Sequence, residues 1–403
     1  MDKIRLTIRL NMEIYLFIFF YLFSTFYSFI RVFTDSKTIR VCLLVMVLYL
    51  FLFFYYIKKY KNIVWSCIVL FLLVLGYILI CLGKYNYPIY THISNGVFPA
   101  ILTGYSSLYA LLFIGIYRKA KDLNSALFYT AIINYFLQLI RLVIIILPSE
   151  NLSKTGYDMD FGYKMLFSCI VFLSIYLENK EKRYIWLFLS SIVLMIYIGS
   201  RGPILCVLVY LFLYFLIFEF NKSTFRRKII ICIIFIFGLA IAYIYYNYIA
   251  VLIDFSSLPR SIQTVLNFRF SDGTNESRIR IANRIEELIS NNGFWGSGLL
   301  SDQANLGPGM YSHNIFLEFQ ITFGKFPGLF VFVIIVIQTI RLLKSKYLED
   351  DYKRVFIVFV ALLCRLLVSY SFWYDINFWC FVSLMLVLSK IARNNKKHDL
   401  IGT

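Results

Sequence analysis

Apolar runs of about twenty residues recur along the whole 403-residue chain, and this pattern constrains the fold more than any other feature. A helix of about 20 apolar residues is long enough to cross a hydrocarbon core of about 30 Å. The runs are continuous rather than alternating, which favours helices over a membrane barrel. Because 60% of the residues are hydrophobic and only 15% are charged, we expect an all-α polytopic membrane protein.

The runs predict about twelve transmembrane helices within a single transmembrane domain that covers the whole chain, 1–403. The expected spans are 14–30, 41–57, 63–82, 97–117, 125–147, 161–177, 184–200, 203–220, 229–250, 327–343, 355–371 and 374–391. One long loop, 251–312, separates the ninth span from the tenth. An enzyme that works at a membrane surface needs such a loop more than a transporter does.

The formal net charge of +18 indicates membrane topology rather than nucleic-acid binding. Lysine and arginine gather in alternate connectors, for example at 58–61, 118–121 and 226–228. Such an excess is typical of cytoplasmic connectors. Both termini are therefore expected in the cytoplasm and loop 251–312 outside, in a multi-pass protein of the inner membrane. Membrane lipids are the expected surroundings, with no nucleic-acid partner.

Arg141 and Arg365 each lie about six residues from the outer end of a predicted span, roughly 9 Å below the surface. An intramembrane arginine costs at least ~2.5–3.5 kcal/mol on insertion scales, so it usually finds a partner or serves a function. Each arginine could also extend to the interface, and this reading stays open. With Lys164 and Arg201 on the same side, the four cations suggest an anionic partner at the outer face.

Arg201 lies in the turn 199–203, Gly-Ser-Arg-Gly-Pro, where two spans meet almost without a loop. Glycine permits unusual backbone angles, and proline suits the first turn of the next helix. A guanidinium group held at such a turn could clamp phosphate oxygens in bidentate fashion. The alternative is an incidental surface arginine.

The long loop contains an amphipathic pattern at 276–290, which predicts a helix. Arg280 and Arg284 fall on its solvent face, whereas Arg278 falls on the apolar face in the first turn. A cation there opposes the helix dipole. This unfavourable placement suggests a bound anion, although an arginine that bends to water at a frayed helix end would look the same.

His313 is one of only three histidines in the chain. It follows Ser312, a plausible N-cap for a helix at 313–323. A histidine in the first turn of a helix tends to stay neutral, as a general base requires. A solvent-exposed loop histidine is the alternative. No second histidine or acidic cluster has metal-ligand spacing relative to it, so we expect no metal site.

Several of these residues form a pattern that resembles the signature of the O-antigen polymerase and ligase superfamily. The matching elements are the 199–202 turn, Ser277-Arg278, Gly296-Ser297-Gly298, His313-Asn314, Leu317-Glu318 and Gly324. The resemblance covers roughly 184–343 and agrees in order and spacing. One departure is Asn283, where family members often carry an aromatic residue.

The resemblance implies a GT-C-like, metal-independent glycosyltransferase that acts on undecaprenyl-pyrophosphate-linked glycans without a cofactor. Arg201 and Arg278 would bind the pyrophosphate, and His313 would be the base toward the acceptor hydroxyl. The remaining candidates for substrate binding are Arg141, Arg365, Lys164, Asn314 and Tyr311.

Within this family the leading hypothesis is a Wzy-type polymerase of O-antigen or capsular repeat units. Its partners would be the lipid-linked donor and acceptor and a chain-length regulator. An O-antigen ligase that transfers glycan to lipid A–core is the alternative. A lipid-linked oligosaccharide flippase or other transporter is a hypothesis from another class, but it should carry charges through the bilayer midplane. The outer-leaflet position of the intramembrane arginines favours surface chemistry.

Overall fold

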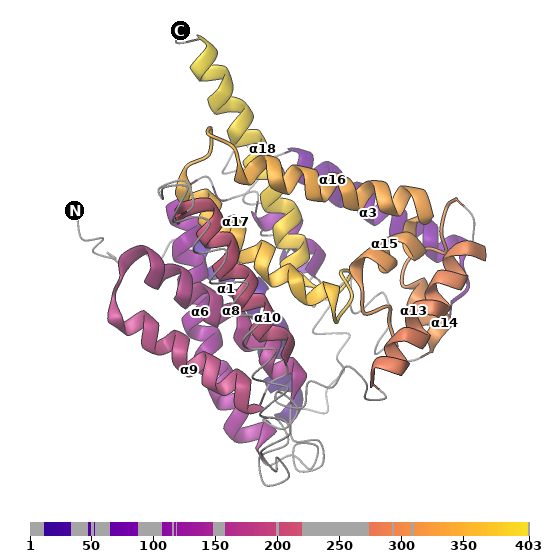
Figure 1. Ribbon diagram of the computed structural model, residues 1–403, viewed down its shortest axis with the longest axis horizontal. Helices are drawn as coiled ribbons and strands as arrows, with labels where there is room; N and C mark the ends of the chain where they lie inside the picture. The colour runs from indigo at the N-terminus through magenta and orange to yellow at the C-terminus, as the bar shows by residue number, and fades with distance from the viewer. Residues whose placement is uncertain are drawn as a thin grey trace, which may run out of the picture.

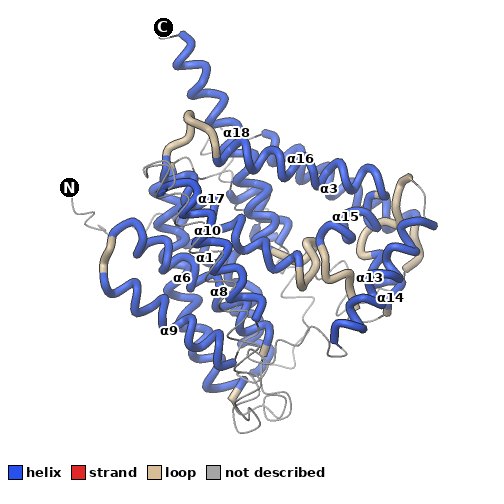
Figure 2. The backbone as a smooth tube through the Cα atoms, in the orientation of Figure 1, coloured by secondary structure: helices blue, strands red, loops and turns tan. Residues whose placement is uncertain are grey.

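The computed structural model consists of helices and connectors, with no strand in the part of the chain that it describes (Figure 2). The described residues are 12–33, 47–49, 52, 65–87, 107–114, 117, 119–147, 158–198, 201–219, 274–291, 294–307 and 310–401. The longer helices are α1 (Met12–Phe33), α3 (Trp65–Lys84), α6 (Ala120–Arg141), α8 (Met159–Asn179), α9 (Lys182–Ile198), α10 (Arg201–Tyr214), α13 (Thr274–Asn291), α16 (Lys325–Leu343), α17 (Asp350–Leu363) and α18 (Ile376–Ile401). Shorter elements are η2 (Ser107–Tyr109), α5 (Ala110–Phe113), η4 (Leu142–Ile146), η5 (Phe215–Glu219), α14 (Ser301–Leu306), α15 (Ile315–Phe323) and the 3-10 turn η7 (Cys364–Leu367).

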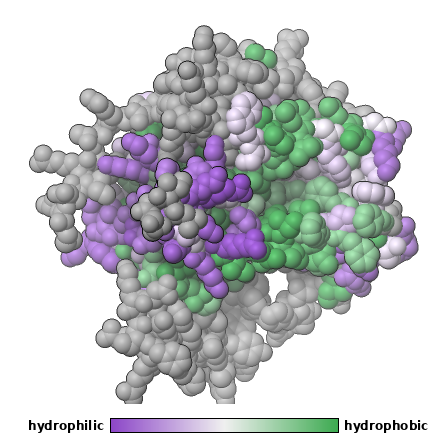
Figure 3. Space-filling view, turned by 90° about the horizontal axis from the view of Figure 1, so that it is seen from above, coloured by the Kyte–Doolittle hydropathy of each residue, from purple (hydrophilic) through white to green (hydrophobic). Residues whose placement is uncertain are grey.

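Six helical segments in the described residues are long and apolar enough to cross a membrane, which supports a multi-pass helical membrane protein. They are Trp65–Lys84, Ala120–Ile144, Met159–Asn179, Gly202–Glu219, Lys325–Leu343 and Ile376–Asp399. Large apolar side chains on α3 and α16 are exposed, among them Leu73 and Phe330. A broad hydrophobic face is visible in Figure 3. Lipid contact would remove this apolar surface from water.

Most predicted spans coincide with helices. The six membrane-length segments correspond to predicted spans 63–82, 125–147, 161–177, 203–220, 327–343 and 374–391. The predictions at 14–30 and 184–200 correspond to α1 and α9. Span 229–250, and most of spans 41–57 and 97–117, lie outside the described residues.

The eleventh predicted span, 355–371, was wrong at its outer end. Helix α17 stops at Leu363 and tightens into η7, and a non-helical connector then runs to the start of α18. Arg365 therefore lies in a turn at the helix end rather than six residues inside a helix. The connector contains aromatic as well as polar residues, so the apolar run along the sequence does not show where the helix ends.

Helix α8 is the centre of the main bundle and packs against α6, α9, α10 and α17 (Figure 1). Its interface with α6 includes polar contacts. The Asn134 amide donates hydrogen bonds to the Lys164 carbonyl and to the Ser168 hydroxyl, both at 2.8 Å. These bonds fix the rotation of α8 against α6, because leaving a buried amide unsatisfied is costly.

Helices α13, α14 and α15 lie together at one side of the molecule, away from α6 and α9 (Figure 1). Ile285 and Ile289 of α13 form a small core with Leu317 and Ile321 of α15. Arg280 on the opposite face of α13 is exposed. The amphipathic helix predicted for 276–290, with its apolar face inward, is therefore confirmed.

The Gly-x-Gly segment docks directly on the end of α15. The backbone N–H groups of Ser297 and Gly298 donate to the carbonyls of Ile321 and Thr322 at 2.8 and 3.2 Å. Gly296 and Gly324 both have positive φ, 68° and 103°. A side chain on either glycine would collide with the backbone of the facing segment, so glycine is required at this contact.

Candidate functional site

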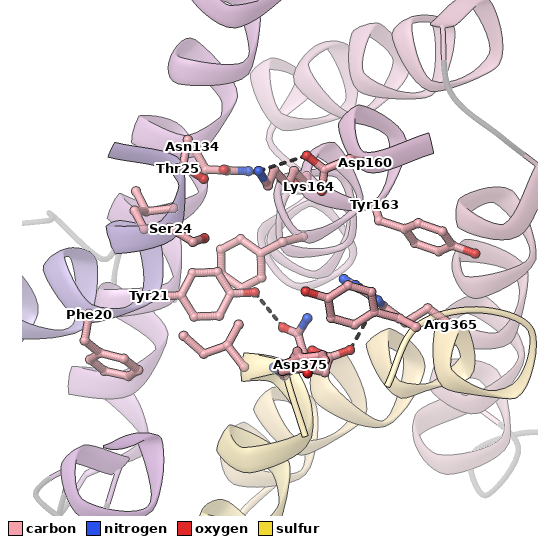
Figure 4. Close-up of a pocket in the computed structure, with 16 residues that line it drawn as sticks. Phe20, Tyr21, Ser24, Thr25, Asn134, Asp160, Tyr163, Lys164, Arg365 and Asp375 are labelled. Carbon is pink, nitrogen blue, oxygen red and sulfur yellow. Dashed lines mark hydrogen bonds and ion pairs between the residues drawn. The ribbon is translucent and has the colours of Figure 1, made fainter. Parts of the chain in front are cut away.

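A polar cavity of about 190 Å³ lies where α1, α6 and α8 meet the connector between α17 and α18 (Figure 4). Four tyrosines, two asparagines and four charged side chains line it: Tyr21, Tyr163, Tyr370, Tyr374, Asn134, Asn377, Asp160, Lys164, Arg365 and Asp375. The C-terminal end of α17 and the N-terminal ends of α8 and α18 surround it. The predicted topology puts these helix ends at the outer face.

Each of the three predicted cations whose side chains the structure describes near the cavity has a carboxylate partner. Arg365 Nε is 3.2 Å from Asp375 Oδ2, and Lys164 Nζ is 2.9 Å from Asp160 Oδ2. Arg141 reaches the same Asp160 oxygen at 2.9 Å, with Asp158 at 3.5 Å. Asp375 is almost fully buried, so this pair is shielded from solvent. An anionic ligand is therefore not needed to account for these three cations.

Arg365 is also held between two aromatic rings. Its guanidinium carbon is 4.1 Å from the ring centre of Tyr370 and 5.0 Å from that of Tyr163. Tyr370 has a φ of 73°, which is uncommon for a bulky residue. Backbone strain of this kind persists where the surroundings determine the conformation, and it clusters at functional sites.

Arg201 is next to the cavity because the following residue, Gly202, lies against a tyrosine that lines it. A Cβ on Gly202 would lie 2.8 Å from Cζ of Tyr163 and closer still to its hydroxyl, so α10 approaches this ring closely and a larger residue would displace it. Helix α10 also contacts η7, the turn that carries Arg365. The backbone of Arg201 thus begins a helix packed on the cavity wall, whereas its side chain is outside the described part.

His313 lies on the segment that leads into α15, and α15 contacts η7. Its φ of 52° is left-handed, and its ring centre is 4.0 Å from that of Tyr311. The Tyr311 hydroxyl is 3.1 Å from Ser369 Oγ, in the connector next to Tyr370. His313 does not line the cavity itself. It is joined to one wall of the cavity through Tyr311 and Ser369.

The predicted cap of this helix was wrong by two residues. Asn314, not Ser312, is the N-cap of α15, and its side-chain oxygen accepts from the Phe316 N–H at 2.9 Å. His313 therefore precedes the cap rather than occupying the first turn, where the dipole acts most strongly. The Ser312 N–H instead donates to Asp302 Oδ2 at 2.9 Å. Asn314, a candidate for substrate binding, uses its side chain in the cap.

Two buried carboxyl groups form hydrogen bonds that hold two segments of the site. These segments are 311–314, which contains His313, and the connector 368–375 between η7 and α18. Asp302 accepts from Ser312, and Glu318 accepts from the Ser371 hydroxyl and from the Phe372 N–H at 3.1 Å. Burial raises the pKa of Glu318 well above its usual value, and the nearby Asp302 raises it further. Burial also raises the pKa of Asp302. Glu318 thus joins α15 to the connector that lines the cavity.

The structure therefore brings Arg141, Lys164 and Arg365 into one cluster and places Tyr311 and His313 beside it. For Arg278 it describes only the backbone, near the start of α13. That helix packs on α15.

Sequence reasoning missed the carboxylates and tyrosines that line the cavity: Asp160, Asp375, Tyr21, Tyr163, Tyr370 and Tyr374. It also missed two carboxylates near the cavity, Asp158 beside Arg141 and Glu318 on α15. Acidic residues at the outer ends of two predicted spans could have indicated Asp160 and Asp375.

The described residues define a helical multi-pass membrane protein with a polar site where several helix ends meet. Residues 186–333 match the family model described as O-Antigen ligase. The match confirms the predicted resemblance to the O-antigen polymerase and ligase superfamily over this segment, which contains Arg201, Arg278 and His313. It supports a glycosyltransferase-like function of the ligase or polymerase type. No curated protein and no solved structure matches the chain.

Proposed function

We propose that the protein polymerises lipid-linked repeat units of an O-antigen or capsular polysaccharide at the outer face of the inner membrane. The growing glycan would leave undecaprenyl pyrophosphate and pass to a hydroxyl of the next unit. The observation that carries this proposal is the family match over 186–333, because that segment contains all three residues with an assigned chemical role.

In the proposed reaction, an acceptor hydroxyl attacks the anomeric carbon of the donor glycan. A glycosidic bond forms, and the bond from that carbon to the diphosphate oxygen breaks. His313 takes the proton of the hydroxyl as general base. Arg201 and Arg278 stabilise the negative charge that develops on the departing diphosphate. The donor brings its own activated bond, so the proposed step uses no metal and no cofactor.

Two features of the described residues support this arrangement. The left-handed backbone and the Tyr311 contact hold His313 beside the connector, which supplies Tyr370 to the cavity. Arg201 begins helix α10, which lies against Tyr163 of the cavity and contacts η7, the turn that carries Arg365. The proposal also includes a GT-C-like arrangement of about twelve spans. Loop 251–312 is outside and both termini are cytoplasmic.

A ligase that transfers finished glycan to lipid A–core is the second candidate, because the matched family model is itself described as O-Antigen ligase. The two activities share the donor, the leaving group and the three proposed catalytic residues. They differ only in the acceptor, so the acceptor must decide between them.

The test uses full-length purified protein with a defined lipid-linked repeat unit, with and without a lipid A–core acceptor. Long glycans without core would support the polymerase, and transfer only to core would support the ligase. His313→Ala should lower the rate by about 10²–10⁴-fold, the usual contribution of a general base. Arg201→Ala and Arg278→Ala should each abolish product.

The matched control is Arg280→Ala, on the exposed face of the same helix as Arg278. It should leave the rate unchanged. Full activity in the His313, Arg201 and Arg278 variants would refute the mechanism. Loss of activity in Arg280→Ala as large as in Arg278→Ala would refute the helix-face argument.

A further inference from the structure

The charged side chains of the cavity compensate one another. Among the described lining residues, Lys164 and Arg365 are matched by Asp160 and Asp375. Just behind them, Arg141 is matched by Asp158 as well as by Asp160. A diphosphate placed here would meet two carboxylates as well as two cations. The repulsion from the carboxylates would cancel much of the attraction that a phosphate site requires.

The uncharged lining is rich in hydroxyl, amide and aromatic groups. Tyr21 donates to Asn377 Oδ1 at 2.6 Å, which fixes the orientation of this amide at the cavity wall. Ser24 and Thr25 of α1 face the same space (Figure 4). Tyrosine rings bring apolar faces next to these polar groups.

The carboxylate of Asp160 remains accessible. Its side chain is 55% exposed, although it pairs with both Arg141 and Lys164. An ionised carboxylate accepts hydrogen bonds through several lone pairs, and those to hydroxyl donors are strong. The cation pairs thus hold the carboxylate in place without covering it.

The size of the cavity sets a further limit. Its volume of about 190 Å³ is below the roughly 300–1,000 Å³ of pockets that hold drug-sized ligands. A glycan chain or a prenyl tail would not fit, whereas one compact ring with several hydroxyl groups would. Among the lining residues that the structure describes, the many hydrogen-bonding groups, the aromatic surface and the balanced charges match an uncharged sugar better than a phosphate.

We propose that this cavity binds a single uncharged sugar residue of the acceptor repeat unit, and that the diphosphate of the donor binds elsewhere. This inference rests on the proposed glycosyl transfer. It assigns binding of the acceptor sugar to α1, α6, α8 and the connector. Binding of the departing diphosphate is assigned to Arg201 and Arg278. Arg141, Lys164 and Arg365 then position Asp160 and Asp375 instead of binding phosphate.

The test is photo-crosslinking of the full-length protein in nanodiscs. One probe is the lipid-free repeat-unit oligosaccharide, released from its lipid by mild acid and carrying a diazirine. The other probe is a diazirine-bearing farnesyl diphosphate. The oligosaccharide should label peptides that contain residues 20–25 or 370–377, and excess inorganic pyrophosphate should not reduce this labelling.

Asn377→Ala should lower the labelling by about tenfold, since it removes a hydrogen-bonding group from the cavity wall. Asn395→Ala, at the far end of the same helix α18, is the matched control. The oligosaccharide should label this variant to the same extent as the native protein. Tyr21→Phe keeps the ring and removes only the hydroxyl that orients Asn377. It should lower labelling by a smaller factor, even if Asn377→Ala fails to fold.

The proposal is overturned if pyrophosphate competes with the oligosaccharide, if the farnesyl diphosphate labels the same peptides, or if the oligosaccharide labels neither. These outcomes are separate from the proposed function. If glycan transfer depends on His313 but the oligosaccharide does not label the cavity, only the proposed sugar site is refuted. Labelling in the cavity without glycan transfer would refute the proposed glycosyl transfer and leave a sugar-binding cavity without its acceptor role.

Discussion

At the scale of single residues, the site depends on buried acids as much as on the arginines that the sequence made prominent. Asp375 pairs with Arg365, and its other oxygen accepts from the Asn377 N–H at 2.8 Å. Glu318 accepts two hydrogen bonds from the connector. These acids fix where the cavity wall lies. A cation near a membrane surface therefore cannot be assigned to a ligand before its internal partners are known.

Glu318→Ala should destabilise the protein, whereas Glu318→Gln should be tolerated. Alanine leaves the buried Phe372 N–H without an acceptor, a loss that costs about 1–3 kcal/mol. Glutamine keeps an oxygen for this N–H and an amide for Ser371. The thermal unfolding midpoint in detergent should fall clearly for the alanine variant and little for glutamine. Equal losses would show that Glu318 acts through its negative charge.

The same residue predicts a pH dependence. The pKa of Glu318 is raised in the folded protein, so above its ordinary value of 4.5 the folded state binds more protons than the unfolded state. Stability should therefore be greatest at low pH and decline as the pH rises toward the raised pKa. Unfolding midpoints from pH 5 upward should fall more steeply in the native protein than in Glu318→Gln. Parallel slopes would contradict this.

At the scale of elements, tyrosine side chains from the α3 region attach the segment 294–298 and helix α15 to the rest of the protein. The carbonyl of Gly296 accepts from Tyr85, and that of Thr322 accepts from Tyr77 of α3. The Gly-x-Gly segment in turn pairs with the end of α15. The glycines of the family signature thus hold the segment 294–298 against the end of α15.

Gly324→Ala should therefore undock this segment. Gly324 has a φ of 103°, and a Cβ would collide with the carbonyl of Phe294. The control is Gly76→Ala in the middle of α3, where nothing lies within 4 Å of the added Cβ. Limited proteolysis should cleave the Gly324 variant faster between α13 and α15, with loss of activity. The Gly76 variant should match the native protein, and equal proteolysis of both would contradict the prediction.

At the scale of the whole molecule, the site lies where the ends of α8, α17 and α18 come together. The charge distribution predicts that these ends face outward. At the other end of the bundle, Arg354 pairs with Glu178 at 2.8 Å and with Asp351 at 3.1 Å. Charged residues thus occupy both ends of the helices, and the polar cavity is at one of them.

Reporter fusions test this topology. Alkaline phosphatase inserted between α13 and α14 should be active, since loop 251–312 is predicted to be extracytoplasmic. The same enzyme fused after Thr403 should be inactive, while green fluorescent protein there should fluoresce. An active phosphatase at the C-terminus would reverse the predicted orientation and place the cavity on the cytoplasmic side.

The sequence by itself determined the properties that depend on local periodicity and composition. Continuous apolar runs predicted helices, the spacing in α13 predicted its buried face, and the signature residues predicted the family. Each of these follows from residues a few positions apart along one element. For the same reason the end of α17 was misplaced, because apolar and aromatic residues continue along the sequence past Leu363, where the helix ends.

Only the tertiary structure decided which groups meet. The pairing of Arg365 with Asp375, of Arg141 with Asp160, and of Glu318 with the connector depends on how helix ends are arranged in space. No spacing along the chain encodes these contacts. Because a buried charge is costly unless it is paired, these contacts stabilise cations whose partners the sequence did not show.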